Sequence, residues 1–198
     1  AGYKVGIIAQ PDTTTDTDIT RLGEPRLFWG VNGGSVDSMV ANYTASGKKR
    51  HTDDYTPGGD NDRRPNRAVI AYTNLIKRYF KSTKPIILGG IEASLRRVAH
   101  YDFWSDSIRR SILFDAKADY LLYGMAERSI LELAQRLSDG TSIDDLRGLC
   151  RIASDTPDGY LTLPTYEQVV QDKYQFIHMF FDFYLNNDPL TAKRLVQQ

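Results

Sequence analysis

The stretch Pro85–Asp106, PIILGGIEASLRRVAHYDFWSD, is the part of the chain that decides the fold. It opens with the apolar run Ile86-Ile87-Leu88, which stops at Gly89-Gly90. A β-branched run closed by two glycines is typical of a buried strand whose chain turns sharply at its carboxyl end. Polar and aromatic side chains follow directly: Glu92, Ser94, Arg96, Arg97, His100, Tyr101, Asp102 and Trp104. Because ligands bind at the carboxyl edge of open α/β sheets, we expect the working surface here.

The same order of strand, glycine turn and helix recurs elsewhere in the chain. Expected strands are Tyr3–Ala9, Arg26–Val31, Pro85–Leu88 and Asp119–Tyr123. Expected helices are a short one ending at Leu22, Ser35–Tyr43, the segment from Pro65 to Phe80, Ser107–Phe114 and Ala126–Leu137. Residues 44–64 are polar and irregular, and a loop of this length is usually functional or mobile. This order predicts a three-layer, doubly wound α/β fold with a mainly parallel sheet.

The pattern changes beyond residue 148. Leu149–Ala153 and Tyr160–Leu163 predict two short strands around the turn Asp155–Gly159. Thr165–Gln168 predicts a capping box that begins a helix through Leu185. The aromatic stripe of that helix either packs back on the sheet or forms the neck to a further domain. We therefore expect an α/β domain over residues 1–148 and a β-turn plus long helical extension over residues 149–198.

The charge of the chain is balanced overall but unevenly distributed. Lys plus Arg and Asp plus Glu number 25 each, and 41% of the residues are hydrophobic, which is ample for a packed core. Residues 48–110 hold 14 basic against 7 acidic side chains, whereas both flanking regions are acidic. A basic middle can attract nucleic acid or another anionic partner, although a solvated basic face is the simpler explanation.

Several classes of protein are excluded or disfavoured by the sequence. The single cysteine, Cys150, excludes a disulfide scaffold and a cluster held by cysteines of this chain alone. Neither GxGxxG nor GxxxxGK[ST] occurs, so nucleotide sites of those types are disfavoured. No apolar run approaches ~20 residues, and no signal peptide is visible, so we expect no membrane partner and a cytoplasmic location.

Two groups of residues are the candidate site. The glycine turns and the helix starts after them are candidates for binding a cofactor: Gly33, Gly34, Ser35, Gly89, Gly90, Gly124 and Glu127. The side chains after the third strand are candidates for binding substrate: Glu92, Ser94, Arg96, Arg97 and His100. Alternatively, the glycines only allow turns, the glutamates interact with helix dipoles, and the arginines pair with nearby aspartates. No second His or Cys lies near His100, so no metal site is expected.

Several long segments together resemble the YgiQ-type radical SAM proteins. These segments are IAQPD at 8–12, LGEPRLFWGVNGGSVDSMV at 22–40, RHTDDYTPGG at 50–59, RPNRAVIAY at 64–72, LGGIEASLRRVAHYDFWSD at 88–106, RRSILFDAKADYLLYGMAER at 109–128 and RLVQ at 194–197. The resemblance covers nearly the whole chain, and the segments occur in the same order.

The resemblance implies an α/β region similar to cobalamin-binding and flavodoxin-like domains, placed before a radical SAM barrel. It further implies that the parent protein is an enzyme with a [4Fe–4S] cluster, bound through a CxxxCxxC motif, and S-adenosylmethionine. This chain lacks that motif and any DxHxxG-type ligand for cobalamin, so we expect no cofactor here. We also expect the first strand of such a domain to be missing. The expected role is recognition of an unknown substrate or cofactor, with the downstream barrel as partner, while enzymatic activity of this chain alone stays open.

Overall fold

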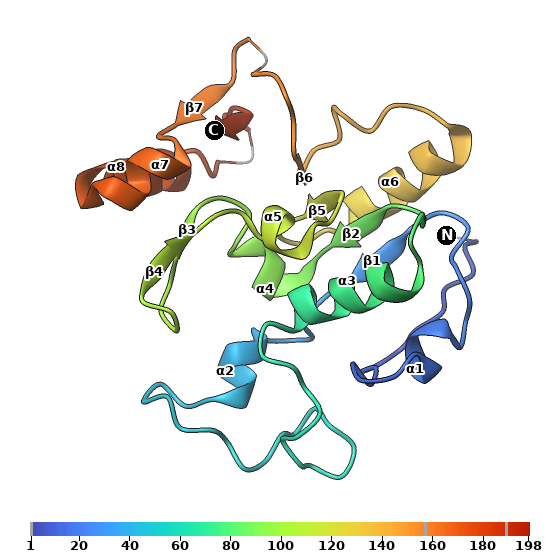
Figure 1. Cartoon of the computed structure of the whole chain (residues 1–198). Coiled ribbons are helices and arrows are strands. Elements are labelled where there is room, and N and C mark those ends of the chain that lie inside the picture. The colour runs from blue at the N-terminus through green and yellow to red at the C-terminus, as the bar shows by residue number, and fades with distance from the viewer. Residues whose placement is uncertain (1, 157, 189) are drawn as a thin grey trace. The chain divides into compact units, whose positions relative to one another are not determined.

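The computed structural model describes residues 2–156, 158–188 and 190–198 (Figure 1). Its helices are α1 (Thr17–Thr20), α2 (Ser38–Asn42), α3 (Ala68–Tyr79), α4 (Gly90–Ser94), α5 (Ile112–Ala116), α6 (Glu127–Asp139), α7 (Tyr166–Gln171) and α8 (Lys173–Leu185). Its strands are β1 (Trp29–Val31), β2 (Ile86–Leu88), β3 (His100–Asp102), β4 (Ser107–Arg109), β5 (Tyr120–Leu122), β6 (Leu149–Arg151), β7 (Leu161–Leu163) and β8 (Leu195–Gln197). In the part of the chain that the structure describes, no helix is both long and apolar enough to cross a membrane.

The chain divides into two compact units. The first unit runs up to Arg97 and continues over Ile112–Arg151, and the second comprises Val98–Ser111 and Ile152–Gln198. The hairpin β3–β4 thus belongs with the C-terminal segment. Whether residues 1–148 form an independent domain, as the sequence suggests, stays a prediction.

The first unit is built on a four-stranded sheet with the order β1-β2-β5-β6. β1, β2 and β5 are parallel, with Trp29 opposite Ile86 and Ile87 opposite Tyr120. β6 runs antiparallel to β5. The predicted mixed α/β fold with a mainly parallel sheet is therefore confirmed, whereas the finer doubly wound, cobalamin-binding-like or flavodoxin-like topology stays a prediction.

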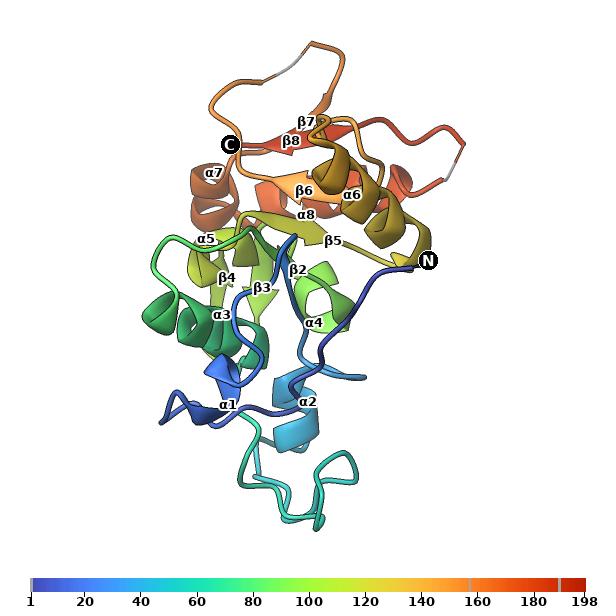
Figure 2. The same cartoon turned by 90° about the vertical axis from the view of Figure 1, so that its right-hand side faces the viewer.

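Helices cover both faces of this sheet because β2 is apolar at every position (Figure 2). Successive side chains of a strand point to opposite faces. Ile86 and Leu88 accordingly join one core with side chains of α3 and α5, and Ile87 joins another with Leu133 of α6. All three β2 side chains are at most 2% exposed, and burying each contributes about 1.5–3 kcal/mol.

Several local predictions in the first unit are confirmed. The runs at 26–31, 85–88 and 119–123 contain β1, β2 and β5, and the helices expected over Ser35–Tyr43 and Ala126–Leu137 correspond to α2 and α6. Gly140 ends α6 at φ +68°, and its N–H donates to the carbonyl of Arg136.

The structure contradicts the strand predicted at residues 3–9 and the position predicted for Pro65. Residues 3–9 form no strand: none of the strands that the structure describes pairs with them, and Val5 and Ile7 are 79% and 80% exposed. The apolar pattern is present, but a strand requires a hydrogen-bonding neighbour. Pro65 precedes α3 by three residues rather than occupying its first turn, because Arg67 at φ +58° forms the N-cap.

The predicted helix Ser107–Phe114 is also wrong. Its first half is β4, which pairs antiparallel with β3, so that His100 lies opposite Arg109. Its last three residues are the beginning of α5 (Ile112–Ala116). Strands of three residues are too short to show a periodicity, and the helical spacing of the α5 residues extended the prediction too far upstream.

In the second unit, β7 pairs with β8 in parallel, while α7 and α8 contribute to a separate core. The two strands expected on either side of the turn 155–159 are present as β6 and β7. They do not pair with each other, because β6 pairs with β5 and β7 pairs with β8. Pro157 within that turn lies outside the described residues. The capping box at Thr165 is confirmed, but the single predicted helix is two helices, because Asp172 has extended backbone angles. The aromatic members of the predicted stripe do not pack inward: Phe180, Phe181 and Tyr184 are 54%, 57% and 64% exposed. Other side chains of α8, Phe176, Met179 and Phe183, join the core instead.

Candidate functional site: the carboxyl edge of the parallel strands

The three glycine turns lie at one edge of the sheet, as the sequence predicts. They follow β1, β2 and β5, which are parallel and therefore end on the same side. The turns also contact one another: a Cβ added at Gly90 would lie 3.2 Å from Asn32 Cβ, and Gly124 N donates to Ser94 Oγ at 3.1 Å. Gly90 has φ +78°, a conformation that favours glycine.

Glu92 is the central support of this edge. Its side chain is buried, with the residue 2% exposed. Oε2 accepts the backbone N–H of Ser38 at 3.0 Å, and Oε1 accepts that of Val69 at 3.1 Å. These donors belong to the first turns of α2 and α3, where backbone N–H groups have no partner within the helix. Glu92 therefore ties α4 to two other helices, and both of its carboxylate oxygens are engaged inside the protein.

Arg96 provides a second tie. Its Nη1 pairs with Oδ2 of Asp37 and donates to the carbonyl of Glu92 at 2.9 Å. Asp37 is itself the N-cap of α2, since its Oδ1 accepts the N–H of Met39 at 2.9 Å. The side chains of Arg96 and Asp37 are only 15% and 10% exposed. This pair fixes the loop after β1 against α4.

Arg97 packs beside a tyrosine and the single cysteine. Its guanidinium carbon lies 4.6 Å from the centre of the Tyr123 ring, and Nη1 donates to the carbonyl of Ser94 at 2.5 Å. Burial lowers the pKa of Arg97 and raises that of Tyr123. Burial also raises the pKa of the Cys150 thiol to about 11, although the Arg97 charge opposes this. At neutral pH the thiol is therefore protonated, which makes it a poor nucleophile and a poor metal ligand.

The exposed part of the edge is different in character. Of the predicted residues, Gly34, Ser35, Gly90, Gly124 and Glu127 are exposed, Gly89 is half-buried, and Gly33, Glu92 and Ser94 are buried. Two large apolar side chains project directly after the glycine turns: Ile91 is 44% and Met125 is 90% exposed. Leu95, one helical turn after Ile91, is 60% exposed. Exposed apolar groups at a ligand-binding edge are typical of a contact surface.

The predicted substrate residues are only partly brought together. Glu92, Ser94, Arg96 and Arg97 all belong to the first unit, but their polar groups serve mainly to hold the loops in place. His100 belongs to the second unit, in β3, with Nδ1 3.2 Å from the carbonyl of Val98. The exposed residues Ile91 and Met125 were missed by sequence reasoning. The available signal was an apolar residue next to a glycine turn, where a helix begins.

The glycines of this edge differ in the space around them: Gly34 and Gly124 face open space, whereas Gly33 faces Glu92. A Cβ at Gly33 would lie 2.4 Å from Glu92 Oε2, so the Cα face of Gly33 is occupied by a carboxylate of the protein. Among the described residues, no group of three or more His, Cys, Asp or Glu is placed to hold a metal ion. One half-buried, protonated cysteine does not supply the ligands of an iron–sulfur cluster.

Four of the nine arginines of the basic middle lie close to acidic side chains. Arg64 lies 2.7 Å from Asp53, and both side chains are nearly fully buried. Arg109 lies 4.0 Å from Asp102, and Arg110 lies 3.3 Å from Glu167. Together with the Arg96–Asp37 pair, these contacts remove part of the charge that an anionic partner would bind.

Comparison with known proteins gives a consistent result. The family model described as radical SAM N-terminal matches residues 1–198. A UPF0313 protein of Fusobacterium nucleatum is 55% identical over 198 residues, which are 100% of this chain and 35% of that protein. A UPF0313 protein of Thermotoga petrophila is 59% identical over 174 residues, 86% of this chain and 30% of that protein. A UPF0313 protein of Geobacter sulfurreducens is 46% identical over 203 residues, 100% of this chain and 33% of that protein.

No solved structure matches the chain. The chain spans about a third of the length of the curated relatives it matches. The resemblance to YgiQ-type radical SAM proteins is thus confirmed. The chain belongs to the radical SAM N-terminal family and corresponds to the N-terminal part of UPF0313 proteins.

Proposed function

We propose that this chain is the recognition region of a radical SAM enzyme and is not catalytic by itself. The observation that carries the proposal is the construction of the carboxyl edge. Buried Glu92 and Arg96 hold the loops rigidly, while Ile91 and Met125 remain exposed on top of them. A rigid support with an exposed apolar surface suits contact with another part of the protein and with a substrate enclosed there.

The proposal assigns the cofactors to the part of the protein downstream of this chain. That part would bind the [4Fe–4S] cluster and S-adenosylmethionine and would be the main partner of the edge. Cobalamin is not proposed, because the chain contains no DxHxxG-type ligand for it. A cytoplasmic location and a doubly wound topology akin to cobalamin-binding domains belong to the same proposal.

Association of the two parts tests this proposal. Two polypeptides would be prepared separately and mixed in a calorimeter. The first is residues 1–198, and the second is the part that follows this region in a protein as long as the UPF0313 relatives. We expect binding that weakens at least about tenfold, or about 1.4 kcal/mol, when Ile91→Asp and Met125→Asp are combined. Val40→Asp in α2 and Leu131→Asp in α6, at exposed apolar positions outside the glycine turns, are the matched controls. Absence of binding, or equal weakening by the controls, would contradict the proposal.

The alternative function is a nucleic-acid or anionic-partner module that uses residues 48–110. The pairing of Arg64, Arg96 and Arg109 with aspartates speaks against it. Filter binding over a range of salt concentrations separates the two functions, since phosphate contacts produce a steep loss of affinity with salt. Absence of binding at low salt rejects the alternative.

A further inference from the structure

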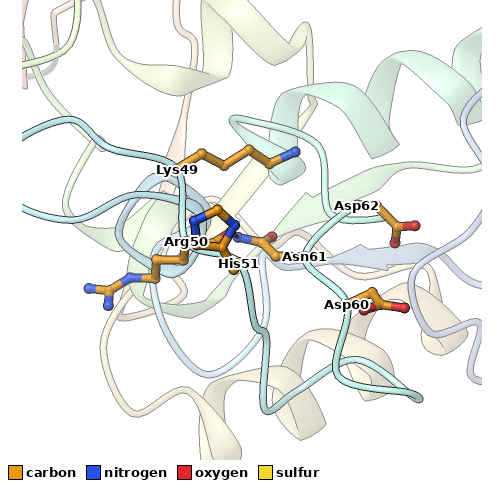
Figure 3. A pocket seen from close by; sticks show the side chains of 6 residues that line it. All are labelled: Lys49, Arg50, His51, Asp60, Asn61 and Asp62. Atoms are coloured by element: carbon orange, nitrogen blue, oxygen red, sulfur yellow. Dashed lines mark hydrogen bonds between the residues drawn. The ribbon is translucent and has the colours of Figure 1, made fainter.

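Two hollows in the described part of the chain have opposite linings. One lies in the 44–64 loop, has a volume of about 350 Å³ and is lined by Lys49, Arg50, His51, Asp60, Asn61 and Asp62 (Figure 3). The other belongs wholly to the second unit, has a volume of about 270 Å³ and is lined by Tyr101, Ile108, Val169, Val170, Lys173 and Phe176. Charged side chains on an open loop are well solvated, whereas a mainly apolar lining is typical of a contact surface.

The helix α8, which contributes Lys173 and Phe176 to the second hollow, is apolar on two opposite faces. On its inner face, Phe176, Met179 and Phe183 join the core of the second unit. On its outer side, six large apolar side chains are 46–73% exposed: Tyr174, Ile177, Phe180, Phe181, Tyr184 and Leu185. Their spacing of three and four residues places them in one stripe along the helix, which we call the outer stripe.

The outer stripe is unusual for a helix at the surface of a domain. Such a helix normally has an apolar inner face and a polar outer face, whereas a helix that is apolar all round is buried. The rings of Phe180 and Tyr184 stack on each other with their centres 6.2 Å apart, so aromatic surface is gathered and not scattered. The sequence of α8 therefore suits a helix that is packed between two layers.

The chain leaves the second unit at an open sheet edge. β7 and β8 form a two-stranded parallel sheet, in which Leu161 N donates to the Arg194 carbonyl at 2.7 Å. Because alternate residues of a strand bond to the same neighbour, the peptide groups of Leu195 and Gln197 face away from β7. Among the described residues, no further strand pairs with that side of β8. The polypeptide that follows Gln198 thus begins at an edge to which a strand can be added.

The length of the relatives indicates what covers the outer stripe. The chain corresponds to the N-terminal part of UPF0313 proteins and covers 35% of the Fusobacterium nucleatum relative, which leaves about two thirds of such a protein to follow Gln198. That part continues from β8, β8 pairs with β7, and β7 contacts α8. α8 is about 20 Å long, a distance that about six extended residues span. The downstream part therefore starts close to the outer stripe.

We propose that the outer stripe of α8 is the docking surface for the polypeptide that follows Gln198. Aromatic side chains are enriched and lysine, glutamate and aspartate are depleted in the buried centre of protein interfaces, and the outer stripe has this composition. The inference rests on the proposed function for the identity of the partner. It gives that partner a second contact surface, on the second unit, in addition to the glycine turns of the first.

Hydroxyl-radical footprinting of a protein as long as the UPF0313 relatives tests this inference, because the oxidation of a side chain follows its exposure. The chain offers controls of the same residue type and similar exposure: Phe103 at 62% for Phe181 at 57%, and Tyr55 at 59% for Tyr184 at 64%. We expect Phe181 and Tyr184 to be oxidised at least about fivefold more slowly than their controls, since residues at the centre of an interface lose most of their exposure.

Removal of the downstream part should reverse this protection. After cleavage at a protease site inserted behind Gln198, and separation of the two parts, Phe181 and Tyr184 should react as fast as their controls. Met179, which is 2% exposed, should stay protected and so verify that the fold is kept. Before separation, Phe181→Asp combined with Tyr184→Asp should weaken the association of the cleaved parts at least about tenfold, whereas Phe103→Asp combined with Tyr55→Asp should not.

The opposite results overturn the inference. Equal oxidation of stripe and control residues in the long protein means that the outer stripe is uncovered. Protection that persists after the downstream part is removed means that the first unit covers it, and protection that disappears on dilution means that a second copy does. Failure of the proposed function is distinguishable: if the outer stripe is protected and the glycine turns are not, this inference stands and the recognition edge fails. The reverse pattern keeps the edge and overturns this inference.

Discussion

The Glu92 carboxylate accepts the backbone N–H of Val69 at 3.1 Å, so a side chain of α4 caps the separate helix α3. Its other oxygen does the same for Ser38 at the start of α2. A position that the sequence presents as a polar candidate for binding substrate is therefore a structural tie. Ile91 and Met125 remain exposed at this edge of the sheet, and they are part of the recognition surface that we propose.

Replacing Glu92 by Gln should destabilise the protein more than its conservative nature suggests. The amide places an NH₂ group against one of two backbone N–H donors, so one buried donor loses its acceptor. We expect a loss of about 2–3 kcal/mol in the free energy of unfolding, measured in urea. Glu127→Gln, an exposed glutamate in the first turn of α6, should change it by less than about 0.5 kcal/mol. Equal effects at the two positions would show that Glu92 acts only through the helix dipole.

The methyl group added by Gly33→Ala should clash with the Glu92 carboxylate, whereas the backbone angles at residue 33 do not require glycine. The added Cβ would lie 2.4 Å from Oε2, and moving that oxygen breaks its bond to Ser38. We expect a cost of about 1–3 kcal/mol in a wild-type background. In an Glu92→Ala background the same change should cost little, which gives a coupling above about 0.5 kcal/mol in a double-mutant cycle. Additive effects would mean that the conflict lies elsewhere.

The buried pair Asp53–Arg64 should give stability that depends on pH. Although burial raises the pKa of Asp53, hydrogen bonds from Thr56 and Tyr55 and the Arg64 charge leave it below 3.8. Because the pKa of Asp53 is lower in the folded than in the unfolded protein, its charge stabilises the folded state at pH values above the unfolded pKa of about 3.9. This stabilisation is lost as the pH falls through the pKa of the folded protein. Asp53→Asn should therefore cost about 3–5 kcal/mol at pH 7, because Arg64 stays buried without its partner.

The difference between wild type and Asp53→Asn should narrow below about pH 4, when Asp53 of the wild type takes up a proton. Urea unfolding at pH 7 and pH 3 measures this. Asp54→Asn, its exposed neighbour, is the control and should have little effect at either pH. A difference that is the same at both pH values would contradict the assignment.

Cys150 should be nearly inert in the folded protein. With the pKa of its thiol at about 11, the thiolate fraction at pH 7.5 is far below that of a free cysteine. Alkylation by iodoacetamide should be at least about 100-fold slower than for free cysteine, and should become fast in urea. Reaction of the folded protein at the rate of free cysteine would contradict the burial described here and would reopen a ligand role for this thiol.

Much of the first unit could be predicted from the sequence because its signals are local. An apolar run closed by glycines at β2, and the regular apolar spacing of α6, identify their elements without reference to partners. The shared edge of the three turns follows from parallel pairing alone. What the sequence could not indicate are pairings over long distances: β6 with β5, β7 with β8, and the absence of a partner for residues 3–9.

The grouping of the glycine turns at one edge could be predicted from the sequence, but the burial of the polar side chains beside them could not. The sequence located the edge, yet it assigned the buried groups Glu92, Ser94 and Arg96 to substrate. Their hydrogen bonds reach Val69, Gly124 and Asp37, and contacts of that separation have no local signature. Burial decides whether a polar residue supports a loop or meets a ligand, and burial depends on the whole fold.

The most direct test of the recognition surface is hydrogen–deuterium exchange, comparing residues 1–198 alone with the same residues in a polypeptide as long as the relatives. The amides to follow are those of Ser35, Ile91, Met125 and their glycine neighbours. We predict that their exchange slows markedly when the downstream part is present, while exchange at the exposed residues Val40 and Leu131 stays the same. Unchanged exchange at all three glycine turns, with protection appearing elsewhere on the first unit, would contradict the claim that this edge is the recognition surface.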